Sequence, residues 1–98
     1  MVKHIVFFRV QSDIYNKEQV IQDIIDILLP LKNKIPQIKF YELGINFADK
    51  KTAFDLALIS EFNNAKDLEI YRKHPEHIKA VEKIKNFISE TAVVDYEI

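Results

Sequence analysis

The sequence predicts an α+β protein with the ferredoxin-like order β-α-β-β-α-β, in which the helices cover one face of an antiparallel sheet. Runs of alternating, β-branched and aromatic residues indicate four strands, and longer stretches with apolar residues at helical spacing indicate the helices. Glycine occurs once and proline three times, so long and regular elements are expected. The length of 98 residues suits a single domain, spanning residues 1–98.

The first strand is expected over residues 2–10, VKHIVFFRV, where β-branched and aromatic residues dominate. Both faces of this strand carry apolar side chains, because Ile5 and Phe7 alternate with a second apolar set. That second set consists of Val2, His4, Val6, Phe8 and Val10.

The first helix is expected within residues 16–35. Asn16 and Gln19 resemble a capping box at its start. Pro30 is expected to kink or tighten the final turn, and Pro36 prevents any continuation. The apolar positions at helical spacing are Val20, Ile21, Ile24, Ile25, Leu28 and Leu31.

Residues 37–47 and 54–62 are expected to form the second and third strands, joined through the polar turn ADKKT. The lone Gly44 within a strand suggests a bulge or a close approach of another backbone. Ala57 and Ile59 should lie on one face of the third strand. The other face should carry Phe54, Leu56, Leu58 and Phe62.

The second helix is expected to begin after Asn64, an N-cap residue, and to break before Pro75. Proline suits the first position of a new helix, which is expected over about residues 76–88. A fourth strand should follow in the terminal run TAVVDYEI, residues 91–98. The new helix is expected to bury Ile78, Val81, Ile84 and Ile88.

The predicted sheet has one face that its own helices do not cover, although that face carries large apolar side chains such as Ile5 and Phe7. Exposed apolar surface costs about 25 cal/mol for each Å² left in water. A second copy of the chain is the simplest cover, so the sequence predicts a homodimer whose two sheets form an α+β barrel.

The composition argues against several classes of partner. Fourteen basic and fifteen acidic residues leave a formal charge of −1, so no basic excess favours nucleic acid. The absence of cysteine excludes disulfides and thiolate metal sites. The apolar start is interrupted by charged residues, and no stretch approaches the roughly 20 residues of a membrane span. A cytoplasmic protein without a membrane contact is the expectation.

Several segments, taken in order, are similar to the stress-responsive A/B barrel domain (Dabb) family. They are VKHIVFF at the start, IPQI, ELGINF, FDLALISEF, LEIYRKHPEHIKAV and the closing VVDYEI. The motif Y-x-x-H-P-x-H is the most specific of them, and the resemblance covers nearly the whole chain. It implies a ferredoxin-like α+β fold that dimerises into a barrel, the architecture also expected from the sheet.

The olivetolic acid cyclase branch, which this chain distantly resembles, closes a linear polyketide by an aldol condensation without a cofactor. The resemblance implies that His77 is the acid/base group, that Tyr71 holds or polarises a carbonyl, and that His4 lines the same cavity. We expect His74, with His4, to contact the substrate. The cyclase has a further histidine on its third strand, where Leu56 stands in this chain.

The motif HPEH allows three interpretations. In the first, His77 is a general base, since histidine has the unperturbed pKa nearest neutrality, and Tyr71 donates a proton to the developing enolate oxygen. In the second, His74 caps a helix and the motif is only a corner, although Asn, Asp, Ser and Thr are better caps. In the third, His74 and His77 bind a metal with Glu76 or Asp95, but the spacing lacks a zinc motif.

Two functions follow for the whole protein. One is a homodimer that binds a small organic molecule in a cavity of each subunit, with cyclase- or lyase-like acid-base chemistry and neither metal nor cofactor. The alternative is a non-catalytic, stress-associated dimer with a structural HPEH corner. Asp95 is expected to contact either a neighbouring strand or a helix amide. In the catalytic case, the phenylalanines of the strands are expected to line the cavity, at positions 7, 8, 40, 54 and 62.

Overall fold

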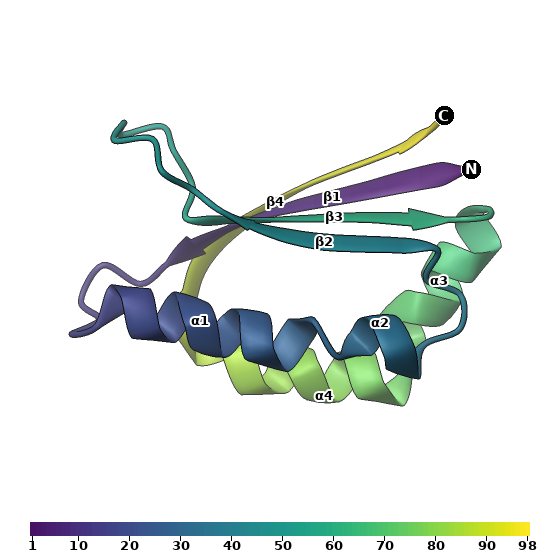
Figure 1. Ribbon diagram of the computed structural model, residues 1–98, viewed down its shortest axis with the longest axis horizontal. Helices are drawn as coiled ribbons and strands as arrows, with labels where there is room; N and C mark the ends of the chain where they lie inside the picture. Colours follow the sequence, from purple (N-terminus) through teal and green to yellow (C-terminus); the bar gives the residue numbers. More distant parts are fainter.

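The computed structural model describes residues 1–98 as one four-stranded sheet with every helix on the same side (Figure 1). The strands lie in the order β2-β3-β1-β4, and each neighbouring pair is antiparallel. This arrangement confirms the predicted ferredoxin-like fold. The elements are β1 (Val2–Val10), α1 (Lys17–Leu28), α2 (Leu31–Lys34), β2 (Phe40–Ile45), β3 (Leu56–Phe62), α3 (Ala65–Lys73), α4 (Pro75–Ile84), the 3₁₀ turn η1 (Lys85–Phe87) and β4 (Ile88–Glu97).

The core lies between the helices and the sheet face that they cover. Burial alternates along β1 and β3, as expected for strands with one face against helices. Ile24 of α1 and Phe62 of β3 are completely buried there. Other members of the core are Val2, Val6, Phe8, Val10, Ile21, Leu28, Leu31, Leu56, Leu58, Tyr71 and Ile84.

The helix starts form as predicted, because side chains satisfy the free backbone N–H groups. The Asn16 side chain accepts a hydrogen bond from the N–H of Gln19 (3.3 Å), and Asn64 accepts one from Asp67 (2.8 Å). The Gln19 side chain donates to Asp23 rather than returning to Asn16, so the capping box is only half formed.

The end of the second helical segment differs from the prediction. Helix α4 ends at Ile84, and Ile88 begins β4, three residues earlier than expected for that strand. Ile78 is 52% exposed and Val81 is 41% exposed, so their predicted burial is wrong. The buried stripe of α4 is narrower than the sequence pattern, because Ala80 and Ile84 are its buried residues.

Two strand predictions also need correction. Gly44 pairs regularly with Ala57, and a Cβ at Gly44 would meet no atom within 4 Å, so it marks neither a bulge nor a close approach. Phe54 precedes β3 and packs on Phe7, with 5.9 Å between ring centroids, on the face opposite to the one expected. Alternation failed there because Phe54 lies outside the hydrogen-bonded ladder, where strand periodicity does not apply.

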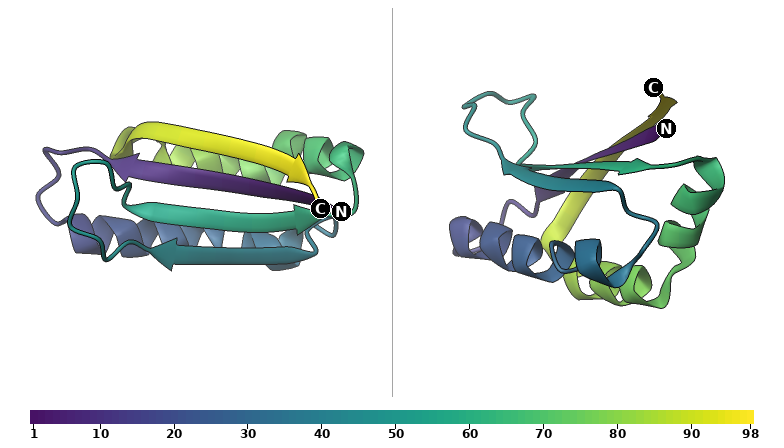
Figure 2. Two further views of the ribbon diagram at one scale, coloured as in Figure 1. Left: turned by 90° about the horizontal axis from the view of Figure 1, so that it is seen from above. Right: turned by 45° about the vertical axis from the view of Figure 1, so that its right-hand side comes forward.

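The sheet face away from the helices is uncovered, as the view from above shows (Figure 2, left). Phe7 of β1 is 42% exposed on this open face, and Val94 of β4 is 58% exposed. The same face also carries Ile5, Phe40, Ala57, Ile59, Ala92 and Tyr96. The apolar open face predicted from both sides of the first strand is therefore present.

None of the helices has the length and apolar character needed to cross a membrane.

Candidate active site between the sheet and helix α4

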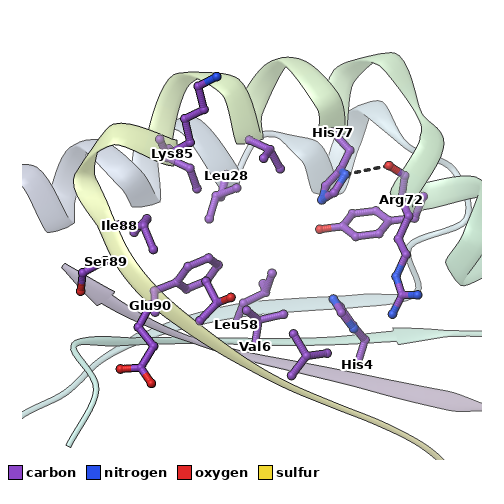
Figure 3. A pocket seen from close by; sticks show the side chains of 16 residues that line it. His4, Val6, Leu28, Leu58, Arg72, His77, Lys85, Ile88, Ser89 and Glu90 are labelled. Carbon is purple, nitrogen blue, oxygen red and sulfur yellow. Dashed lines mark hydrogen bonds between the residues drawn. The ribbon is translucent and has the colours of Figure 1, made fainter. Parts of the chain in front are cut away.

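A cavity of about 640 Å³ lies between the helix-covered face of the sheet and α4 (Figure 3). This volume is within the range of about 300–1,000 Å³ typical of small-molecule sites. Its apolar lining comes from Val6, Phe8, Leu28, Leu58, Val81, Ile84, Ile88 and Val93. The polar end of the cavity is formed by His4, Arg72 and His77, whereas the Glu90 carboxylate at the opposite end points away from the cavity and pairs with Arg9.

His77 points from the first turn of α4 into the cavity (Figure 3). Its Nδ1 lies 3.0 Å from the backbone carbonyl oxygen of Arg72. A carbonyl oxygen only accepts hydrogen bonds, so Nδ1 carries a hydrogen, and in the neutral ring Nε2 is then an unprotonated acceptor. Burial lowers the pKa of His77 below its ordinary value of 6.5, although the Arg72 carbonyl opposes this shift. Burial therefore favours the neutral form of the ring.

Tyr71 of α3 packs directly on His77, with 4.4 Å between the ring centroids, and is 1% exposed. Its hydroxyl lies 3.2 Å from the hydroxyl of Tyr41. Burial raises the pKa of Tyr71 and of Tyr41, so both hydroxyls keep their protons. Either hydroxyl can donate in this contact, and when Tyr41 donates to Tyr71 the hydrogen of Tyr71 is free to reach an acceptor in the cavity. The predicted pairing of His77 with Tyr71 is thus present.

His4 of β1 is buried and lies on the opposite wall of the cavity from His77 (Figure 3). Its Nδ1 is hydrogen-bonded to the carboxylate of Asp95, the residue that faces it on β4. The other oxygen of Asp95 accepts a hydrogen bond from the guanidinium of Arg72. Asp95 therefore contacts a neighbouring strand and an arginine, where a strand or a helix amide was expected.

Arg72 was not predicted from the sequence, and Asp95 was considered only as a metal ligand or as a partner of a strand or helix amide. The available signal was a carboxylate between Val94 and Tyr96 in an apolar terminal strand. Its pairing with His4 depends on the register between β1 and β4, and residues 4 and 95 are too far apart in sequence for local periodicity to relate them.

His74 is placed differently from the other two histidines. Its side chain accepts a hydrogen bond from the N–H of Glu76 (3.1 Å), so it is the N-cap of α4. It does not line the cavity but lies at an outer surface with Lys66, Ile70 and Pro75. Its expected contact with substrate is therefore not supported, whereas capping by this histidine is present.

The phenylalanines were largely misassigned to the cavity. Phe8 lines it, but Phe62 is enclosed in the core and Phe40 is exposed on the open face. Phe7 and Phe54 border a separate hollow of about 430 Å³ on the open face. The cavity walls are mainly aliphatic instead. No three His, Asp or Glu side chains lie close enough together to hold a metal ion.

The fold and this cavity define a class of protein: a ferredoxin-like α+β domain with an uncovered sheet face and a histidine–tyrosine cavity under its helices. Residues 2–98 match the model of the family described as the stress responsive A/B barrel domain. The chain belongs to this family.

Three proteins are similar to this chain in sequence, and two of them also in structure. A dimeric protein of unknown function from Bacteroides fragilis is 34% identical, with a TM-score of 0.87, over 99% of this chain and 95% of that one. A hydroxynitrile lyase from Passiflora edulis is 26% identical, with a TM-score of 0.84, over 99% and 92%. An uncharacterized protein of Streptomyces coelicolor is 27% identical over 99% of both chains.

Proposed function

We propose that the protein is a homodimer whose subunits each bind a small organic molecule and act on it by cofactor-free acid-base chemistry. The observation that carries this proposal is the contact between His77 and Tyr71 at the polar end of the cavity. A neutral imidazole beside a phenol combines a proton acceptor with a proton donor, the pair required to remove a proton next to a carbonyl.

The proposed reaction has two parts. Nε2 of His77 takes a proton from the carbon next to a carbonyl group, and Tyr71 donates a hydrogen bond to the carbonyl oxygen, where negative charge develops. The aliphatic walls hold the rest of the molecule and exclude water. The 26% identity to a hydroxynitrile lyase is consistent with a lyase- or cyclase-like reaction on this fold.

The homodimer part of the proposal rests on the open face. Its exposed apolar residues, such as Phe7 and Val94, match the apolar character of a dimer interface core. The ion pairs Lys3–Glu61 (3.7 Å) and Arg9–Glu90 (2.9 Å) flank them. The dimeric relative from Bacteroides fragilis supports the same arrangement.

Proton abstraction can be tested without knowing the natural substrate. Acetophenone in D₂O exchanges its methyl protons when a base removes them, and ¹H NMR follows the loss of that signal. We expect the wild-type protein to accelerate exchange, and His77→Gln to reduce the acceleration by roughly 10²–10⁴-fold, the usual contribution of a general base. His74→Gln is the matched control and should keep the wild-type rate. Exchange that is equal in both variants would contradict the role of His77.

The second candidate function is a non-catalytic dimer with a structural HPEH corner. It is favoured by the hydrogen bonds of His74 to Glu76 and of His77 to Arg72, because both serve the junction of α3 and α4. In that case wild type should not accelerate exchange, and His77→Gln should lower the free energy of unfolding by roughly 0.5–3 kcal/mol, as ordinary packing mutations do. The exchange rate of wild type and the stability of His77→Gln therefore separate the two candidate functions.

A further inference from the structure

We propose that Arg72 is a positioning residue that directs the Nδ1–H of both cavity histidines to acceptors outside the cavity, so that the two Nε2 atoms enter one cavity from opposite walls. Arg72 does this with two different parts of itself. Its backbone carbonyl acts on His77, and its guanidinium acts on His4 through Asp95. The inference goes beyond the proposed function, which uses His77 and Tyr71 alone.

The contact that orients His77 is made by the main chain of Arg72. The carbonyl of Arg72 accepts from Nδ1 of His77, across the break between α3 and α4. Any residue at position 72 would supply that carbonyl. The orientation of His77 therefore depends on the helix junction and not on the arginine side chain.

The contact that orients His4 depends on the side chain of Arg72, through Asp95. An ionised carboxylate only accepts hydrogen bonds, so the contact between Asp95 and His4 requires a hydrogen on Nδ1. Asp95 lies on β4, an edge strand, where its carboxylate would be free to rotate. The guanidinium of Arg72 binds the second carboxylate oxygen and thereby fixes the orientation of the first.

Arg72 is itself held in place. Its NH1 group donates to Glu69, one turn earlier on α3, at 3.0 Å, while NH2 reaches Asp95. The guanidinium therefore bridges a helix and the edge strand beside the cavity. In Figure 3, His77 extends down from α4, His4 extends up from β1, and Arg72 lies at the same end of the cavity.

One consequence rests on the proposed function. A ligand at this end meets two acceptors on opposite walls and a phenol hydrogen between them. A neutral molecule with a carbonyl group and a nearby hydroxyl, such as an α-hydroxy ketone, supplies the acceptor for Tyr71, the C–H next to the carbonyl for His77 and the hydroxyl hydrogen for His4.

The experiment measures tautomers directly and needs no substrate. Long-range ¹H–¹⁵N correlation spectra of ¹⁵N-labelled protein at pH 8 distinguish Nδ1–H from Nε2–H histidines. In wild type we expect both His4 and His77 as Nδ1–H tautomers. In Arg72→Leu we expect the His4 signals to move to those of the Nε2–H form or of a mixture, and the His77 signals to stay in place because the carbonyl remains.

Two further variants define the inference. Glu69→Gln, the matched control, should leave both histidines unchanged, since Asp95 keeps its contact with Arg72. Asp95→Asn should switch His4 alone, because an amide can donate to Nδ1. This second variant provides the test if Arg72→Leu does not fold. A wild-type His4 in the Nε2–H form, or an unchanged His4 in folded Arg72→Leu, overturns the inference. Either result leaves the exchange test of the proposed function unaffected.

Discussion

The two faces of the sheet meet different needs although the same strands build both. On one face, α1 and α4 cover the apolar side chains of β1 and β3 but leave a cavity beside β4 with histidines in its walls. On the other face, no helix covers Phe7 or Val94, which are 42% and 58% exposed (Figure 2). Val93 and Val94 are neighbours on β4, yet the first lines the cavity and the second lies on the open face. Under the proposed function, ligand chemistry and assembly would be separable, because alternate residues of one strand would serve each.

The largest expected effect comes from a charge placed on the open face. Val94→Lys would bury an unpaired ammonium in each half of a symmetric interface, which costs several kcal/mol per charge. We expect the dissociation constant of the dimer to increase at least about 100-fold, which corresponds to about 2.8 kcal/mol. Sedimentation velocity at micromolar concentration measures it.

Asn86→Lys is the control for that variant, because it adds the same charge at an exposed site on the helix side. It should sediment as wild type does. If Val94→Lys also leaves sedimentation unchanged, the open face is not the interface.

The next effect concerns the cavity. Tyr71→Phe removes the proton donor next to His77 and leaves the hydroxyl of Tyr41 without its partner. We expect the acetophenone exchange rate to fall roughly 10²–10³-fold, as when one oxyanion donor is lost, and the free energy of unfolding to fall by about 1–3 kcal/mol. The sedimentation of this variant should not change. A variant with a normal rate but lower stability would assign Tyr71 to the core alone.

A smaller effect is expected from pH. Burial lowers the pKa of folded His77 below 6.5, so the unfolded chain binds this proton at higher pH than the folded chain does. The free energy of unfolding should therefore be unaffected by this group above its unfolded pKa and should decrease as pH falls toward the folded pKa. Urea denaturation at several pH values between about 7.5 and 5 should show a shallower decrease in His77→Gln than in wild type. Parallel curves would contradict the half-buried placement of the ring.

The smallest effect is expected at the helix cap. His74→Ala should lower the free energy of unfolding by about 0.5–2 kcal/mol because the N–H of Glu76 loses its acceptor. His74→Asn, a stronger N-cap type, should match or exceed wild-type stability. Thermal unfolding measures both, and neither variant should alter the exchange rate. A loss of exchange in folded His74→Asn would return this residue to the active site.

The sequence predicted the order of elements because apolar periodicity is strong in β1, α1 and β3. It failed at Phe54, which lies outside the strand ladder, and on α4, whose apolar pattern is wider than the stripe it buries. Phe54 lies before β3 and packs on the open face instead of the helix-covered face. Ile78 and Val81 lie on α4 outside the narrower stripe that this helix buries. Local chemistry around Pro75 was predictable in kind, as a helix start with a histidine before it.

The site was predictable only in its local part. Tyr71 and His77 are six residues apart on adjoining helices, so one motif brings them together. The contact of Asp95 with His4 and Arg72 joins three separate elements and depends on strand register. The open face was predictable because two apolar faces on one strand require two covers, of which the chain supplies one.

The most direct test of this account is an NMR titration of methyl-labelled protein with acetophenone. We expect saturable shifts at the methyl groups of Val6, Ile84 and Val93, which line the cavity, and no shifts at Ile5, Ile59 and Val94 on the open face. Shifts confined to the open-face methyl groups, or no saturable shifts at all, would contradict a ligand site between the sheet and α4.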